Sequence, residues 1–117
     1  MQKTKTREIS LENLCDTLGI NVDETILKPT DSFDGLYLAW AKEQVRCILL
    51  NPALDEEKRR FVLAHEVGHA MLGAYSRNSS EDKIKQCEME ANVFAAVLMA
   101  LMALCENREG LSCSQKG

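Results

Sequence analysis

Hydrophobic and polar positions follow different periods in different parts of the chain. Over residues 10–18, apolar residues recur every three to four positions, which predicts a short helix. Ser10 at its start and Gly19 after it are residue types that begin and end helices. The apolar runs 36–40 and 45–50 are short and flanked by polar residues, as is typical of strands. Only four residues separate these runs, so they predict a hairpin.

Two longer segments carry the signals of helices. The first begins at Asp55, has acidic residues in its first turn and runs to about Leu72. The second is capped by Ser79 or Ser80 and extends to about Glu106. The order helix, hairpin, helix, helix predicts an α+β fold.

Length and composition indicate one globular domain spanning residues 1–117. Apolar residues make up 45% of the chain and charged residues 27%, which is the balance of a folded protein. The polar ends, residues 1–9 and 107–117, are expected to be flexible. The net charge of -4 argues against nucleic acid as a direct partner, because binding to phosphates needs a concentrated basic surface.

Cysteine usage and hydropathy point to a cytoplasmic protein. The five cysteines are odd in number and no pair has C-x-x-C spacing, which favours reduced thiols. The polar N-terminus lacks the apolar stretch of a signal peptide. The longest apolar run, residues 93–104, has twelve residues, whereas a membrane span needs about twenty. We therefore expect no membrane association.

The candidate chemistry lies in the segment His65-Glu66-Val67-Gly68-His69. Two histidines four residues apart on a helix differ by about 40° of rotation, so both rings leave one face. They can occupy two corners of a tetrahedral zinc site. Glu66 lies to one side, where it can reach a water on the metal as a general base. The chain has only two histidines, and chance alone gives this arrangement roughly once in six hundred.

The alternative to a metal site is a pair of surface histidines on an amphipathic helix. Against that reading, the residues around the motif are nearly all apolar, so the helix is expected to be buried. Buried histidines and a buried glutamate need polar partners, which a metal supplies. The apolar neighbours are Phe61, Val62, Leu63, Ala64, Val67, Ala70, Met71 and Leu72.

A third ligand is required, and no third histidine exists. A carboxylate, a thiolate or a backbone group can fill the place. Glu88 shares a helical face with apolar residues, and a carboxylate on a packing face needs a reason. Glu90 points elsewhere and is expected to be a surface residue. Cys87 is expected to be a small core residue. Glu88 is therefore the preferred ligand.

The segment 60–69, followed by Glu88-x-Glu90-Ala91-Asn92-Val93-Phe94-Ala95-Ala96, resembles the ImmA/IrrE family of metallopeptidases. The preceding Ile48-Leu49-Leu50-Asn51-Pro52 is also similar to that family. The resemblance implies a small zincin-like domain of the gluzincin type that binds Zn²⁺ as its cofactor. It implies His65, His69 and Glu88 as metal ligands and Glu66 as the catalytic base.

Family members are often encoded on phages and mobile elements, and several cleave a helix-turn-helix repressor. The resemblance thus implies a zinc-dependent endopeptidase whose partner is a protein substrate such as a transcriptional repressor. The alternatives are a catalytically inactive metal-binding module that regulates a repressor by contact, and a purely structural metal domain. Tyr37 and Tyr75 are candidates for stabilising an oxyanion, with packing as the alternative role for each.

One stretch departs from the family pattern. The family has a Pro after Leu-Leu-Met, whereas here the apolar run continues through Ala100 without one, so the helix is expected to run straight on. A helix apolar on all sides must be covered. We expect a homodimer through residues 93–104, with a substrate groove as the alternative. Met99 and Met102 are the residues expected to be least needed by the metal-binding helix.

Overall fold

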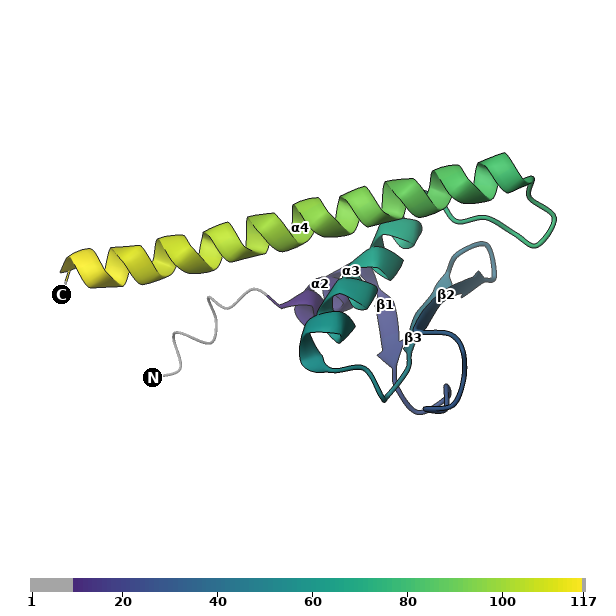
Figure 1. Cartoon of the computed structure of the whole chain (residues 1–117), viewed down its shortest axis with the longest axis horizontal. Helices are drawn as coiled ribbons and strands as arrows, with labels where there is room; N and C mark the ends of the chain where they lie inside the picture. The colour runs from purple at the N-terminus through teal and green to yellow at the C-terminus, as the bar shows by residue number, and fades with distance from the viewer. Residues whose placement is uncertain (1–9, 117) are drawn as a thin grey trace.

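A computed structural model describes the backbone of residues 10–116 and the side chains of residues 10–106 (Figure 1). The α+β fold is confirmed, and the predicted helices and hairpin are present. Residues 1–9 and Gly117, which were predicted to be flexible, lie outside the described part. The elements in chain order are α2 (Leu11–Leu18), β1 (Ile20–Asp23), β2 (Gly35–Trp40), β3 (Val45–Leu50), α3 (Glu56–Leu72) and α4 (Glu81–Lys116).

The three strands form one sheet in the order β1-β3-β2. β2 and β3 are antiparallel, with Trp40 opposite Val45, so the hairpin is confirmed. Its turn has no glycine, and Ala41, Lys42 and Glu43 all adopt positive φ angles. β1 pairs parallel to β3 and was not predicted. It has only four residues, too few for a period-2 pattern to stand out.

Ser10 and Asp55, the residues predicted to begin the first two helices, cap α2 and α3 in the structure. The Ser10 hydroxyl accepts a hydrogen bond from the Asn13 N–H at 3.1 Å, and the Asp55 carboxylate accepts one from the Lys58 N–H at 2.8 Å. Gly19 ends α2 in the left-handed conformation, with φ of 76°. These contacts satisfy backbone groups that a helix end leaves unpaired.

α3 is the central element of the fold. It lies between the sheet on one side and α4 on the other, and α2 packs against its N-terminal part and against β1 (Figure 1). This arrangement buries residues 62–64 and 66–69 of α3, as predicted, whereas Phe61, Met71 and Leu72, which were expected to be buried with them, are exposed. The core around it comprises Leu11, Cys15, Ile20, Ile48, Leu50, Val62, Leu63, Ala64, Val67, Ala95 and Met102.

Asn51, directly after β3, holds the loop that leads into β2. It is a buried polar residue. Its side-chain amide donates to the carbonyl oxygens of Lys28 and Phe33, at 3.1 Å each, and its side-chain oxygen accepts from the Ala53 N–H at 2.9 Å. A single side chain thereby fixes the start of β2 next to α3.

α4 is longer than predicted. It continues to Lys116, whereas we expected an end near Glu106 and a frayed tail over 107–117. Residues 107–116 contain no Pro, and their one glycine, Gly110, costs a helix only about 1 kcal/mol. With 36 residues, α4 spans about 54 Å and accounts for the 56 Å length of the molecule.

Only one face of α4 is covered. Among the described elements, α4 contacts α3 alone. The opposite side, here called the back face, is exposed and apolar; its large residues are Met89, Val93, Val97, Leu101 and Leu104. Met102 is buried and Met99 packs against the core that contains residues of α3, so the expectation that these two methionines are least needed by the metal-binding helix was wrong.

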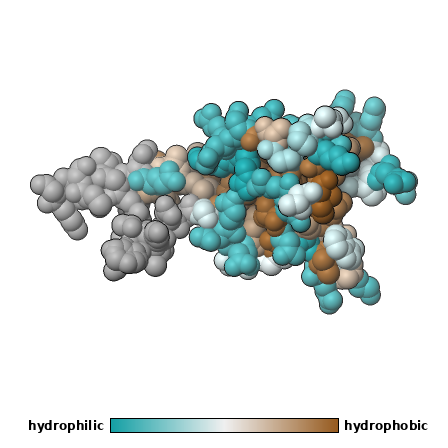
Figure 2. Space-filling model, turned by 90° about the horizontal axis from the view of Figure 1, so that it is seen from below, coloured by the Kyte–Doolittle hydropathy of each residue, from teal (hydrophilic) through white to brown (hydrophobic). Residues whose placement is uncertain are grey.

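Residues Glu81–Glu106 are long and apolar enough to cross a membrane by length and composition, and only 22% of the most apolar 18-residue window is buried. The core helix of a soluble protein can pass the same test. Figure 2 views the molecule from the side away from α4, where hydrophilic residues cover most of the surface and hydrophobic ones show between them.

Candidate metal centre

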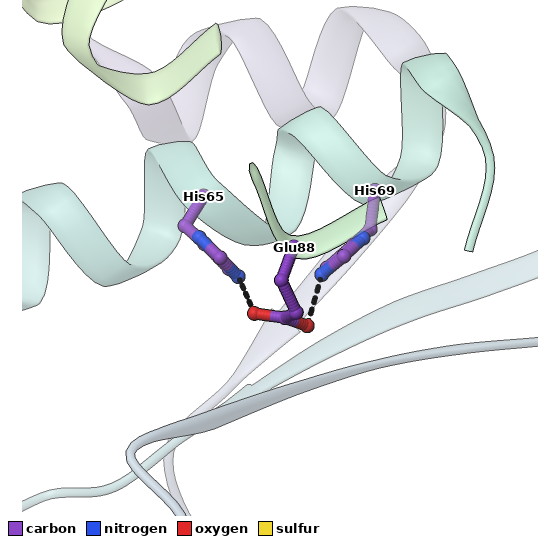
Figure 3. Close-up of side chains that lie close together, drawn as sticks. All are labelled: His65, His69 and Glu88. Atoms are coloured by element: carbon purple, nitrogen blue, oxygen red, sulfur yellow. Dashed lines mark hydrogen bonds and ion pairs between the residues drawn. The ribbon is translucent and has the colours of Figure 1, made fainter. Parts of the chain in front are cut away.

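Two elements bring the candidate ligands together. His65 and His69 project from one face of α3, and Glu88 reaches between them from α4 (Figure 3). Glu88 Oε1 lies 3.2 Å from His65 Nε2, and Glu88 Oε2 lies 3.1 Å from His69 Nε2. One ligand atom from each residue lies within 4.8 Å of the others. Zinc bonds of about 2.0–2.1 Å in a tetrahedron place ligand atoms about 3.3 Å apart, so the two distances between Glu88 and the histidines are close to those around one metal ion.

Asn92 determines which ring nitrogen of neutral His65 carries the proton. Its side-chain oxygen lies 2.8 Å from His65 Nδ1, and this contact assigns the proton of a neutral ring to Nδ1. The Nε2 lone pair then faces Glu88 Oε1, which is also an acceptor. Two acceptors at this distance repel each other unless a proton or a metal ion lies between them. The donor set therefore suits a cation.

His69 is oriented in a different way. It is buried, and its Nδ1 has no hydrogen-bond partner among the described residues. Its ring packs edge-on against His65, with centroids 4.8 Å apart, and against Tyr75 at 5.9 Å. Packing and the contact of Nε2 with Glu88 thus hold His69, whereas the contact of Nδ1 with Asn92 also holds His65.

Glu66 is nearly buried, with 7% of its surface exposed. Burial raises the pKa of its carboxyl to about 7, and the negative charge of Glu88 adds to the rise. A carboxyl with such a pKa can both accept and release a proton near neutral pH. Glu66 is also close to the cluster, because it follows His65 directly on α3.

The close approach of α3 and α4 depends on Gly68. A Cβ at this position would lie 3.1 Å from the Ala91 Cα and 3.2 Å from the Phe94 Cβ. Those distances are shorter than favourable carbon–carbon contacts, so a larger residue would push α4 away by a few tenths of an ångström. Gly68 is thus what lets Glu88 reach the histidines.

The tyrosines are placed differently. Tyr75 lies beside the cluster, and its hydroxyl donates a hydrogen bond to Glu88 Oε2 at 2.9 Å. Tyr37 packs against the core from β2, and its buried hydroxyl has no hydrogen-bond partner among the described residues. The packing role is therefore the one that fits Tyr37.

Two other side chains near the ligands lie outside the cluster. Glu90 accepts a hydrogen bond from Gln86 one turn earlier on α4, at 3.1 Å. Cys87 is buried and free, as expected for a core residue. Neither belongs to the group of side chains that could hold a metal in the described part of the chain.

A pocket of about 240 Å³ opens beside the cluster. Gly35 lines this pocket from the start of β2, and Lys58 and Phe61 line it from the part of α3 that precedes His65. β2 is an edge strand, so within residues 10–116 one of its sides is unpaired. The full lining is Asp34, Gly35, Lys58, Phe61, Val62, His65, Glu66 and Asn92.

Sequence reasoning singled out His65, Glu66, His69 and Glu88, and the structure brings these four together. It missed the contact of Asn92 with His65. A signal existed, because Asn92 lies four residues after Glu88 and so shares its helical face. The contact between Tyr75 and Glu88 has no such signal in the sequence, because Tyr75 lies in a loop and helical spacing does not relate it to Glu88.

The model of the peptidase family M78, described as the IrrE N-terminal-like domain, matches residues 15–104. The matched segment contains every residue of the cluster. No curated protein matches the chain.

Proposed function

Because the chain belongs to the IrrE N-terminal-like peptidase family, we propose that it is a zinc-dependent endopeptidase of the gluzincin type. The observation that carries the proposal is the convergence of His65, His69 and Glu88 beside a buried Glu66. Two imidazoles and one carboxylate form the ligand set of a catalytic zinc site, which keeps a fourth position open.

His65, His69 and Glu88 would hold the zinc ion. When bound, the ion supplies Lewis-acid polarisation of the peptide carbonyl and a lowered pKa for water. Asn92 accepts a hydrogen bond from His65 Nδ1 and thereby keeps Nε2 free to bind. Metal analysis of the purified protein tests the identity of the ion.

Glu66 would move the proton. Its carboxylate takes a proton from the attacking water and passes it to the leaving amine. Burial favours this cycle, because it brings the pKa of the carboxyl to about 7 and so close to working pH. The position next to His65 leaves Glu66 beside the metal rather than on it.

The pocket beside the cluster suits a peptide in extended form. β2 begins at Gly35, which lines this pocket, and one side of β2 is unpaired. An extended segment of substrate can add to such an edge through backbone hydrogen bonds. A helix-turn-helix repressor of a phage or mobile element is our proposed substrate, on the strength of the family resemblance.

We place the protein in the cytoplasm. α4 would need about twenty residues in lipid to span a membrane. Such a span would include Glu88, which faces the histidines, and Ala91, which packs against Gly68. The fold thus uses α4 as part of its core, and this use opposes insertion.

The alternative is an inactive metal-binding module that regulates a repressor by contact. The buried carboxyl of Glu66 speaks against it, because burying an acid beside Glu88 costs stability and a module that only binds has no use for it. A purely structural metal domain meets the same objection.

The test compares wild type with Glu66→Gln, using a helix-turn-helix repressor of a phage or mobile element as substrate. Both proteins should bind one zinc ion, and cleavage should fall by about 10²–10⁴-fold in Glu66→Gln. Glu90→Gln is the matched control and should cleave at the wild-type rate. Equal cleavage by Glu66→Gln would refute the base assignment, and a stable complex without cleavage by wild type would favour the binding module.

A further inference from the structure

Tyr75 lies in the segment that joins α3 to α4, and its hydroxyl points inward. The hydroxyl donates to Glu88 Oε2 at 2.9 Å. The Tyr75 ring meets the His69 ring edge-on, with centroids 5.9 Å apart and an interplanar angle of 85°. A single side chain therefore touches two of the three proposed metal ligands.

The backbone on both sides of Tyr75 is held in place. Before it, the Gly73 N–H donates to the His69 carbonyl at 3.0 Å, and Gly73 has a φ of 111°, which favours glycine. After it, the Ser76 N–H donates to the Ser79 hydroxyl and the Ser79 N–H to the Ser76 carbonyl, both at 3.0 Å. The loop thus presents Tyr75 to the site in a defined position.

Glu88 is the ligand that most needs such support. The two histidines are largely buried on α3, with 13% and 6% of their side chains exposed, whereas 38% of the Glu88 side chain is exposed. Its three side-chain torsions leave the carboxylate free to turn toward water. Fixing a flexible side chain costs entropy, and a hydrogen bond from a rigid neighbour offsets that cost.

A packing role does not account for this geometry. The Tyr75 residue is 38% exposed and lies outside the hydrophobic core. A phenyl ring would give the same edge-on contact with His69, so the hydroxyl has its own function. A phenol keeps its proton at neutral pH, and a carboxylate can only accept, so the Tyr75 hydroxyl is the donor in this contact.

We propose that Tyr75 is a positioning residue that orients the Glu88 carboxylate for metal binding. The inference rests on the proposed metal site and adds to it a residue outside α3, the helix that carries both histidines. By donating to Oε2, Tyr75 fixes the rotation of the carboxylate and directs the remaining lone pairs toward the histidines. When a residue that hydrogen-bonds to a metal ligand is replaced, metal affinity typically falls by about 10–100-fold.

Tyr75→Phe tests the proposal, and Tyr37→Phe is the matched control, because it removes a buried hydroxyl away from the cluster. Zinc affinity is measured by competition with a chelator, and the visible spectrum of the Co²⁺-substituted protein reports the ligand geometry. Tyr75→Phe should bind zinc about 10–100-fold more weakly and show a changed Co²⁺ spectrum. Tyr37→Phe should match wild type in both measurements.

Thermal unfolding of the metal-free proteins separates positioning from folding. Since the Tyr75 ring is retained, metal-free Tyr75→Phe should melt as wild type does. Wild-type zinc affinity and an unchanged Co²⁺ spectrum in Tyr75→Phe would overturn the inference while leaving the metal site intact. A wild-type protein that binds neither ion would overturn the proposed function itself.

Discussion

Gly68→Ala changes the contact that sets the distance between α3 and α4. The added Cβ would lie 3.1 Å from the Ala91 Cα and 3.2 Å from both Cβ and Cδ1 of Phe94. Favourable carbon–carbon contacts are about 3.5–4.0 Å, so all three pairs are too close. The Ala91 Cα is backbone and the Phe94 Cβ adjoins it, so neither can rotate away. α4 must therefore shift by a few tenths of an ångström.

Two opposing effects decide the size of the change. Overpacking costs about 1–3 kcal/mol. Ala is a better helix former than Gly by about 0.8–1.0 kcal/mol, which offsets part of that cost. We expect Gly68→Ala to lose about 1 kcal/mol of unfolding free energy, or about 4 °C in melting temperature. Because the shift also moves Glu88 away from the histidines, zinc affinity should fall on the order of tenfold.

Urea unfolding of the metal-free protein and zinc competition measure the two consequences separately. Ala96→Gly is the control, because Ala96 is exposed on α4 and has no part in the contact. It should lose about 1 kcal/mol through helix propensity alone and keep its zinc affinity. A Gly68→Ala protein that is about 1 kcal/mol more stable than wild type and binds zinc equally well would refute the close-packing argument.

Three further predictions concern other parts of the chain. Glu88→Gln should lose zinc binding while Glu90→Gln keeps it, as metal analysis will show; loss only in Glu90→Gln would reverse the assignment. Although burial opposes its charge, the hydrogen bond from Arg59 holds the pKa of Glu12 below its ordinary value, so stability should fall as the pH drops from about 5 to 3. Arg59→Met should flatten that dependence in urea titrations at each pH. The large residues of the back face lie at similar intervals on both sides of Val97, so two antiparallel copies of α4 can cover each other's back face. Sedimentation should show a dimer for wild type and a monomer for Val97→Glu. A wild-type protein that is monomeric at high micromolar concentration would exclude the dimer.

The elements that sequence reasoning predicted well are those specified by local interactions. A capping side chain acts within three residues, as Ser10 and Asp55 do, so the starts of α2 and α3 could be read directly. The same holds for the two histidines, because one turn of helix places them together. β1 was not predicted, because a segment of four residues forms a strand only when β3 lies beside it.

The sequence by itself predicted a metal site on the segment that forms α3, and it singled out Glu66 beside the two histidines as the candidate base. Which of Glu88 and Glu90 lies beside the histidines was decided by the crossing of two helices, because only one flank of α4 faces His65 and His69. Tyr75 reaches Glu88 across a loop whose course no sequence period describes. Contacts between residues distant in the chain depend on how whole elements pack, and packing is settled by volumes and hydrogen bonds that form only in the folded protein.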